Sequence, residues 1–340
     1  MKIGVFDHFD SDGGVLAAQY AWRLELIEAY DRSGIDIYHL AEHHSTALGL
    51  APSPSVFLSA VAQRTKRLRF GPLVYTLPLH HPLRVFEEIC MLDQMSGGRL
   101  ELGVGRGISP FESVYYGFDP KQAREMYAEV FDILMKAFVS TSLDHEGKHY
   151  RFKGTPVVIA PVQRPHPPLW YGVGGPESVD TPARHGMNVG TNAPNAVVRQ
   201  ITDRYRAQWQ AAGRDPGVLP LMGMGRHIVI AESDDAALAI ARRAYAQWHR
   251  RFVHLWRLNG VEPIAATYPD TADGSIAAGM SFVGSPATVR TKLSAAVEET
   301  GVNYLMLRFA FGDMTLAEAL RSLALFTQEV RPSLVAQERR

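Results

Sequence analysis

The sequence contains a single cysteine, Cys90, among its 340 residues. One thiol cannot form a disulfide within the chain, so a disulfide-stabilised fold is excluded and a reducing compartment is expected. The first residues, MKIGVFDHFD, hold no sustained apolar segment and no cleavage signal. No apolar run reaches the roughly 18 residues that a membrane-spanning helix needs. The sequence therefore predicts a cytoplasmic protein that does not enter a membrane.

The chain also lacks an excess of charge of either sign, with 35 basic and 35 acidic residues. A balanced charge gives no electrostatic reason to expect nucleic acid or an anionic membrane surface as a partner. Hydrophobic residues make up 46% of the chain, which is enough for a large core. We expect a single domain over residues 1–340 with a small molecule as its partner.

Eight short apolar segments alternate with amphipathic segments along the chain. Near-continuous apolar runs of this kind are typical of parallel strands that are buried on both faces. The pattern predicts a (β/α)8 TIM barrel, an α/β fold, with a doubly wound sheet as the second alternative. The eight expected strands are residues 3–6, 35–41, 68–76, 100–105, 168–174, 186–191, 226–231 and 302–309.

Two long segments between the expected strands are interpreted as loops. A long glycine-containing stretch, residues 258–282, separates the seventh and eighth expected strands. Loops of this length in a compact domain usually serve a function, so we expect a long insertion that acts as a lid. A second segment, residues 154–176, is dense in proline and glycine and is interpreted as a long loop within the same domain.

Three ionisable residues, Glu42, His43 and His44, directly follow the second expected strand. In a parallel barrel the active site forms at the carboxyl ends of the strands, so this position favours a catalytic role. The alternative is an ordinary polar start to a loop. Successive residues of a strand point to opposite faces, so adjacent histidines rarely bind one metal ion, and we expect no metal.

The fourth and fifth expected strands end in features that suit a phosphate group. Gly105 and Arg106 close the fourth strand, and the fifth runs into Gly174, Gly175 and Ser178, where a short helix begins. An arginine fork and the free N–H groups of a glycine turn both favour an anion. The glycine spacing is not that of a dinucleotide-binding fingerprint. A structural ion pair remains the alternative for Arg106.

Several of these segments together resemble the bacterial luciferase-like flavin monooxygenases, which include luciferase and the alkanesulfonate monooxygenases. The resemblance spans most of the chain. It implies a TIM barrel that binds reduced FMN supplied by a separate NAD(P)H-flavin reductase. Oxygen would add at C4a of the flavin, and the resulting hydroperoxide would oxidise an organic substrate. Members are often homodimers. The matching segments are GIDIYHLAEHH, GPLVYTLPLHHPLRVFEEICMLDQMSGGRLELGVGRG and YGVGGPESVDTPARHG.

The resemblance also implies roles for residues around the flavin ring. The family has a non-proline cis peptide bond under the isoalloxazine, and the matching bond is Leu73–Val74, followed by Tyr75. The first histidine of the E-H-H string, a proposed base in luciferase, matches His43. His44 and Glu42 would then orient the base or contact the cofactor.

The family's phosphate site carries over with some differences. Its arginine matches Arg106, and its phosphate turn matches Gly174, Gly175 and Ser178. Luciferase has an acidic residue and a serine in place of the two glycines. Gly105 stands where luciferase has a reactive cysteine, so no role for that cysteine carries over.

Two histidines in or near the first and seventh strands complete the candidate residues. His8 and His227 are candidate substrate contacts, and the alternative is a core or rim position. His227 is similar to a site histidine of the alkanesulfonate monooxygenases.

The predicted function is an FMN-dependent monooxygenase that uses O2 to oxidise a small, apolar molecule such as an aldehyde or ketone. The stretch from residue 260 to residue 282 has no lysine or arginine, which argues against a sulfonate clamp in that loop. Three alternatives stay open: an F420-dependent oxidoreductase of the same fold, a flavin-binding protein without catalysis, and a metal-dependent barrel hydrolase.

Overall fold

The computed structural model describes residues 1–262 and 268–337. Within them, eight parallel strands form the central sheet, in the order β3-β2-β1-β12-β10-β9-β8-β5. The sheet closes between β3 and β5, because the N–H of Glu101 donates to the carbonyl of Phe70 at 2.8 Å and Phe70 bridges to Leu100. The eight strands are β1 (Lys2–Asp7), β2 (Ile37–Leu40), β3 (Arg69–Pro72), β5 (Leu102–Gly105), β8 (Leu169–Gly172), β9 (Asn188–Thr191), β10 (Met222–Ile230) and β12 (Tyr304–Arg308).

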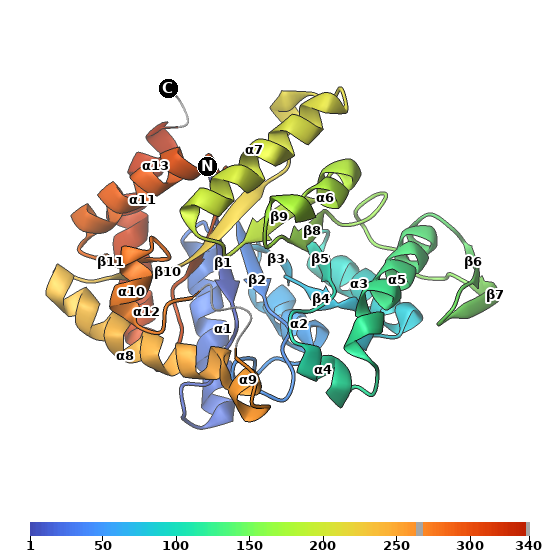
Figure 1. Ribbon diagram of the computed structural model, residues 1–340, viewed down its shortest axis with the longest axis horizontal. Helices are drawn as coiled ribbons and strands as arrows, with labels where there is room; N and C mark the ends of the chain where they lie inside the picture. The colour runs from blue at the N-terminus through green and yellow to red at the C-terminus, as the bar shows by residue number, and fades with distance from the viewer. Residues whose placement is uncertain (263–267, 338–340) are drawn as a thin grey trace.

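This closure confirms the predicted barrel and contradicts the doubly wound alternative, whose sheet would be open at two edges. Helices cover the outside of the strands (Figure 1). They are α1 (Leu16–Arg32), α2 (Pro54–Arg64), α3 (Pro82–Ser96), α4 (Pro110–Tyr115), α5 (Ala123–Phe138), α6 (Asp180–His185), α7 (Asn195–Ala211), α8 (Asp234–Phe252), α9 (His254–Leu258), α10 (Ala272–Ala277), α11 (Pro286–Thr300), α12 (Leu316–Leu325) and α13 (Arg331–Gln337). None of the described helices is long and apolar enough to cross a bilayer.

The ends of these helices follow local chemistry. Proline occupies the first turn of α2, α3 and α11, where its fixed φ suits a helix and its missing N–H costs no hydrogen bond. Gly97 ends α3 with a φ of 65°, in the left-handed region that glycine enters without steric cost. The sequence thus sets where these helices begin and end.

The interior of the barrel is filled by large side chains that pack against glycines. Trp170 and Tyr304 are fully buried, and their rings lie 5.2 Å apart. A Cβ atom at Gly4 would lie 1.7 Å from the hydroxyl oxygen of Tyr304. His39 is also fully buried there, and burial lowers its pKa to about 3, so this imidazole is neutral. The lower barrel is therefore a packed core, and a ligand can bind only at its ends.

The third expected strand is divided in two. The prediction of one strand over residues 68–76 was wrong, because β3 ends at Pro72 and β4 (Tyr75–Thr76) pairs separately with β5. Pro72 supplies no N–H to the ladder, although the N–H of Leu73 still donates to the carbonyl of Leu40 at 2.8 Å. The Leu73–Val74 peptide bond between the two strands is cis, as the family resemblance implied.

Two insertions differ from the expected loops. The segment after α5 forms an antiparallel hairpin, β6 (Ser142–Glu146) and β7 (Arg151–Pro156), that projects from the barrel (Figure 1). The expected loop over 154–176 therefore begins inside a strand. The predicted lid at 258–282 includes α10 and the start of β11 (Ser281–Gly284), which pairs in parallel with the end of β10. Much of that stretch is thus regular structure, and residues 263–267 lie outside the described residues.

Candidate active site

The three ionisable residues after β2 lie at the carboxyl end of the barrel, but their side chains separate. Glu42 and His44 join a buried hydrogen-bonded network, whereas His43 lines a small pocket. Glu42 and His44, two positions apart, thus share the buried network, and His43 between them faces the pocket. The chain therefore gives two adjacent histidines different surroundings.

Glu42 is the centre of the buried network. One of its carboxylate oxygens lies 2.8 Å from Nε2 of His44 and 2.9 Å from Nε2 of His80, and the other accepts the N–H of Thr76 at 3.0 Å. Burial raises the pKa of Glu42, but the hydrogen bonds from His44 and His80 outweigh it and lower that pKa to about 2. An ionised carboxylate only accepts, so both histidines donate from Nε2. The network therefore ties β2 to the segment that follows β4.

His44 is held at both ring nitrogens. Its Nδ1 lies 2.8 Å from the hydroxyl of Tyr116, and because Nε2 carries the proton, Nδ1 accepts that hydroxyl's hydrogen. Burial lowers the pKa of His80, but the hydrogen bonds to Glu42 raise it by a larger amount. The pKa of His80 therefore lies above its usual value. Both nitrogens of His44 are thus engaged within the protein, so this side chain positions other groups.

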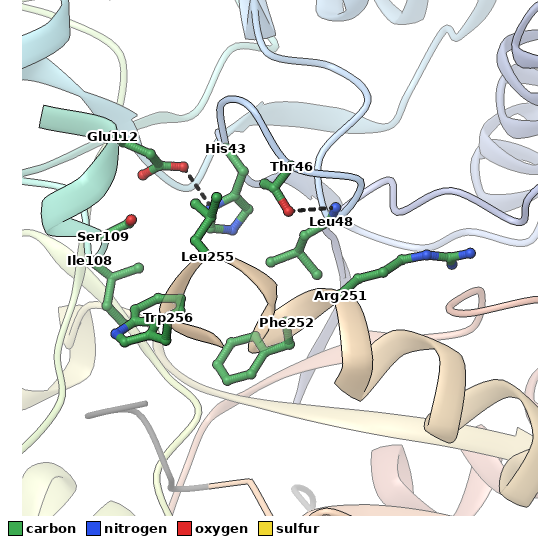
Figure 2. Close-up of a pocket in the computed structure, with 10 residues that line it drawn as sticks. All are labelled: His43, Thr46, Leu48, Ile108, Ser109, Glu112, Arg251, Phe252, Leu255 and Trp256. Carbon is green, nitrogen blue, oxygen red and sulfur yellow. Dashed lines mark hydrogen bonds and ion pairs between the residues drawn. The ribbon is translucent and has the colours of Figure 1, made fainter. Parts of the chain in front are cut away.

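His43 faces a small pocket at the carboxyl end of the barrel (Figure 2). Its Nδ1 lies 3.4 Å from a carboxylate oxygen of Glu112, which also accepts the backbone N–H of His44 at 2.8 Å. A carboxylate beside Nδ1 favours the tautomer that carries its proton there, which leaves Nε2 able to accept a proton. The pocket is lined by His43, Thr46, Leu48, Ile108, Ser109, Glu112, Arg251, Phe252, Leu255 and Trp256.

The predicted substrate histidines, His8 and His227, lie behind this pocket among aromatic rings. The ring of His8 lies 5.6 Å from that of His43, and its Nδ1 accepts the indole N–H of Trp248 at 3.3 Å. His227 is fully buried, and its ring packs edge-on against Trp248 at 4.3 Å. Burial, and then the nearby Arg308 charge, lower the pKa of both histidines well below the usual value. Both imidazoles are therefore neutral.

The predicted phosphate residues lie at or just beyond the carboxyl ends of the neighbouring strands β5 and β8. The register that pairs Gly103 with Trp170 carries Arg106 to the level of the turn after β8. Arg106 is exposed and has no hydrogen-bond or ion-pair partner within residues 1–262 and 268–337, so the structural ion pair is not found there. A Cβ atom at Gly174 would enter open space. An unpaired guanidinium and an open glycine turn thus lie at one end of the barrel.

The other predicted cofactor residues differ in where their side chains lie. The Ser178 hydroxyl donates to the carbonyl of Gly175 at 2.7 Å and is therefore used within its own turn. A Cβ atom at Gly105 would lie 2.5 Å from a methyl group of Val74. Leu73 and Val74 pack in the barrel's upper interior. The hydroxyl of Tyr75 instead lies 2.7 Å from that of Ser55, outside the barrel.

Three residues of the site were not identified from the sequence. His80 follows β4 and reaches Glu42 from there, and Glu112 and Tyr116 come from α4 and its end, about 70 residues from the histidines that they contact. Such partners have no fixed sequence spacing. Within the described residues, no group of three or more His, Cys, Asp or Glu side chains is arranged to hold a metal ion.

Comparisons with known proteins place this geometry in a family. The model of the luciferase-like monooxygenases matches residues 1–304. An uncharacterised protein, y4wF of Sinorhizobium fredii, is 44% identical over 94% of this chain and 93% of its own length. Limonene 1,2-monooxygenase of Rhodococcus erythropolis is 27% identical over 91% of this chain and 80% of its own length.

Solved structures share the fold and differ in cofactor. The oxygenating constituent of 3,6-diketocamphane monooxygenase from Pseudomonas putida, in complex with FMN, matches with a TM-score of 0.82 and 23% identity over 98% of both chains. A coenzyme F420 dependent tetrahydromethanopterin reductase from Methanopyrus kandleri matches with a TM-score of 0.70 and 19% identity, over 98% of this chain and 99% of its own. The fold alone therefore leaves the cofactor open. On the family match over residues 1–304, this chain belongs to the luciferase-like monooxygenases.

Proposed function

We propose that the protein is a flavin-dependent monooxygenase that uses reduced FMN and O2 to oxidise a small, apolar substrate. The observation that carries the proposal is the pairing of His43 with Glu112 at a pocket with mostly apolar walls, at the carboxyl end of the barrel. Membership of the luciferase-like monooxygenases supports the reaction class. The FMN complex of a structural neighbour supports the choice of flavin.

The residues present fit an FMN molecule. Arg106 has a guanidinium free of partners within the described residues, and a guanidinium suits a terminal phosphate. Gly174 leaves space that any side chain would fill, so the phosphate can approach the backbone N–H groups. Leu73, Val74 and Gly105 would provide the apolar surface for the ring. Reduced FMN, when bound, supplies the electrons that activate O2.

His43 would act as the proton acceptor of this site. The carboxylate of Glu112, 3.4 Å from Nδ1, favours the tautomer with the proton on Nδ1 and so leaves the lone pair of Nε2 available. The charge of Glu112 also stabilises the imidazolium that forms when His43 takes up a proton. His44 and Glu42 have no free nitrogen or exposed oxygen for this step, so they would act by fixing the loop that carries His43.

The aromatic and aliphatic walls would keep water away from the reaction. Phe252, Leu255 and Trp256 line the pocket from α8 and α9. Behind them, His8 and His227 are neutral, so they place no charge beside an apolar substrate. Excluding water strengthens polar interactions inside the site and limits side reactions of activated oxygen.

A separate NAD(P)H-flavin reductase would supply the reduced flavin. The alternative cofactor, F420, is favoured by one observation only, the shared fold of the tetrahydromethanopterin reductase.

The test has two stages. First, thermal unfolding is followed with reduced FMN and with reduced F420, because a ligand that binds the native state raises the melting temperature. Reduced FMN should raise it and F420 should not. Second, oxygen uptake and product formation are measured with NADH, FMN and a flavin reductase over a panel of aldehydes and ketones. Protection by F420 alone, or no product from any compound, would contradict the proposal.

A further inference from the structure

The side chain of Tyr116 reaches the buried Glu42 network from the protein surface. Tyr116 directly follows α4 and is 49% exposed, yet its hydroxyl lies 2.8 Å from Nδ1 of the buried His44. A tyrosine at a surface usually packs its ring and leaves its hydroxyl in water. Here the hydroxyl is directed inward instead, which indicates a specific role for its contact with His44.

The backbone and the ring of Tyr116 both fix the position of that hydroxyl. The N–H of Tyr116 donates to the carbonyl of Glu112 at 3.1 Å, and Gly117 follows with a φ of 84°, so the chain turns directly after the tyrosine. The rings of Tyr116 and His44 lie 4.8 Å apart and meet edge-on. The hydroxyl therefore meets the imidazole in a defined geometry.

The direction of this hydrogen bond follows from the charges around it. Burial, and then the carboxylates of Glu42 and Glu112, raise the pKa of the Tyr116 hydroxyl, so it keeps its proton. The carboxylate of Glu42 accepts the proton on Nε2 of His44, which leaves a lone pair on Nδ1 of that ring. The Tyr116 hydroxyl is thus the donor, and the Nδ1 lone pair of His44 is occupied.

The charges that face His44 would otherwise favour a second proton on it. They are the carboxylates of Glu42 and Glu112, and the latter also accepts the backbone N–H of His44 at 2.8 Å. His80 balances Glu42. Burial lowers the pKa of His80, but the hydrogen bonds to Glu42 raise it by a larger amount, so His80 is positively charged at about pH 6. Glu112 remains to attract a proton, and the Tyr116 hydroxyl occupies the nitrogen of His44 that could take it.

His43 has no comparable donor on its second nitrogen. Its Nδ1 lies 3.4 Å from the same Glu112 carboxylate, and its Nε2 has no hydrogen-bond partner within residues 1–262 and 268–337. The two adjacent histidines therefore share one carboxylate, but only His43 offers a free lone pair.

We infer that Tyr116 is a positioning residue that determines which of the two adjacent histidines takes up a proton. Its hydroxyl blocks Nδ1 of His44, so the proton goes to Nε2 of His43, beside the pocket. Tyr116 does not line that pocket and acts through His44. The inference rests on the proposed function, since it concerns the base of that same site, but it can be tested without flavin or substrate.

The first measurement follows the histidine ring nitrogens of the flavin-free protein by two-dimensional nitrogen–proton NMR. The chain has 13 histidines, and the signals of His43 and His44 are identified by their loss in His43→Gln and His44→Gln. In the wild type, lowering the pH from about 8 to about 6 should place the new proton on Nε2 of His43. Over the same range, Nδ1 of His44 should stay unprotonated.

Tyr116→Phe removes only the hydroxyl. In this variant, Nδ1 of His44 should become protonated over the same pH range, and it should do so before Nε2 of His43. Tyr115→Phe is the matched control, because the neighbouring tyrosine is 45% exposed and its hydroxyl lies 3.4 Å from the side chain of Asn259. The spectrum of this control should match that of the wild type.

A second measurement separates this role from a purely structural one. With a compound that the wild type oxidises, product per reduced flavin should fall about tenfold in Tyr116→Phe at about pH 6, because a positive charge on His44 disfavours another on His43. At about pH 8.5, where His44 has released that proton, the loss should be less than about twofold. A structural defect would lower product formation by the same factor at both pH values.

Two results would overturn the inference. One is a wild-type protein in which Nδ1 of His44 already carries a proton at about pH 6. The other is a Tyr116→Phe protein, with an unchanged melting temperature, in which the two histidines take up protons in the wild-type order. Failure of the proposed function is visible separately, because reduced FMN would then give neither thermal protection nor product, while the order of protonation could still be read from the spectra.

Discussion

Glu112 lies against His43, with one carboxylate oxygen 3.4 Å from Nδ1 of the imidazole. The glutamate is only 2% exposed and the imidazole lines the pocket, so the pair joins a buried negative charge to a solvent-protected base. This arrangement distinguishes His43 from its neighbour His44, whose nitrogens are both hydrogen-bonded within the protein.

His43→Gln should therefore remove the base and leave the cofactor in place. We expect product formed per reduced flavin to fall about a hundredfold, because general base catalysis contributes on that scale. Reduced-FMN affinity, measured by fluorescence titration, should stay within about twofold. His81→Gln is the control, because that ring packs against Tyr150 of the hairpin segment. Undiminished product from His43→Gln would remove the role of base.

Arg106→Ala should weaken reduced-FMN binding on the order of tenfold, the effect of one charged hydrogen bond. The free energy of unfolding should change by less than about 0.5 kcal/mol, because the exposed guanidinium contacts no described partner. Arg151→Ala provides a matched control on the projecting hairpin, with a side chain that is 76% exposed. Equal affinity in the Arg106 variant would show that the phosphate is held elsewhere.

Gly174→Val should also act on the cofactor without destabilising the fold. The added Cβ meets no atom within 4 Å, so the melting temperature should hardly change. If the phosphate approaches this turn, the new side chain should weaken reduced-FMN binding about tenfold through steric overlap. Gly174→Ala should give a smaller loss. Titration of both variants with reduced FMN checks this, and wild-type affinity in Gly174→Val would exclude the turn.

Glu42→Gln should destabilise the protein by about 2 kcal/mol, because it removes a buried carboxylate that accepts three hydrogen bonds. Urea unfolding at neutral pH measures this change. The depressed pKa of Glu42 means that its contribution is present at neutral pH and declines as the pH falls from about 4.5 toward about 2. A variant as stable as the wild type would show that the Glu42 network makes no net contribution to the free energy of unfolding.

His80 should give the opposite pH dependence. Burial lowers its pKa, but the hydrogen bonds to Glu42 raise it more, so the folded state binds the proton more tightly than the unfolded state. That stabilisation is complete below the unfolded value of about 6.5 and disappears as the pH rises through the raised folded pKa. The urea midpoint of the wild type should fall over this range. His80→Gln should flatten the decline, and an unaltered slope would contradict the assignment.

The barrel could be predicted because its strands are buried on both faces, so their apolar runs are visible in the sequence. The hairpin at β6 and β7 could not, because its strands are largely exposed and lack an apolar alternation. The strand β11 was missed for a different reason. Its four residues follow a long stretch rich in glycine and alanine, and it becomes a strand only because the end of β10 extends beyond β9 and offers an unpaired edge.

The candidate site was predictable only in part. Glu42, His43 and His44 were identifiable because they follow directly on a strand that ends at the mouth of the barrel. The sequence could not show that Glu42 and His44 join a buried network while His43 lines the pocket. That difference depends on Glu112 and His80, which reach the site from distant segments. Side-chain partners that meet through the fold have no signature at a fixed spacing.

The contact between Gly4 and Tyr304 has a consequence for how this chain can diverge. The tyrosine hydroxyl occupies the volume that any side chain at position 4 would need. Shortening Tyr304 alone would not make room, because a Cβ atom at position 4 would also lie 2.7 Å from the backbone carbonyl oxygen of Ile37. We therefore expect position 4 to stay glycine as homologues diverge, whatever residue the last strand carries.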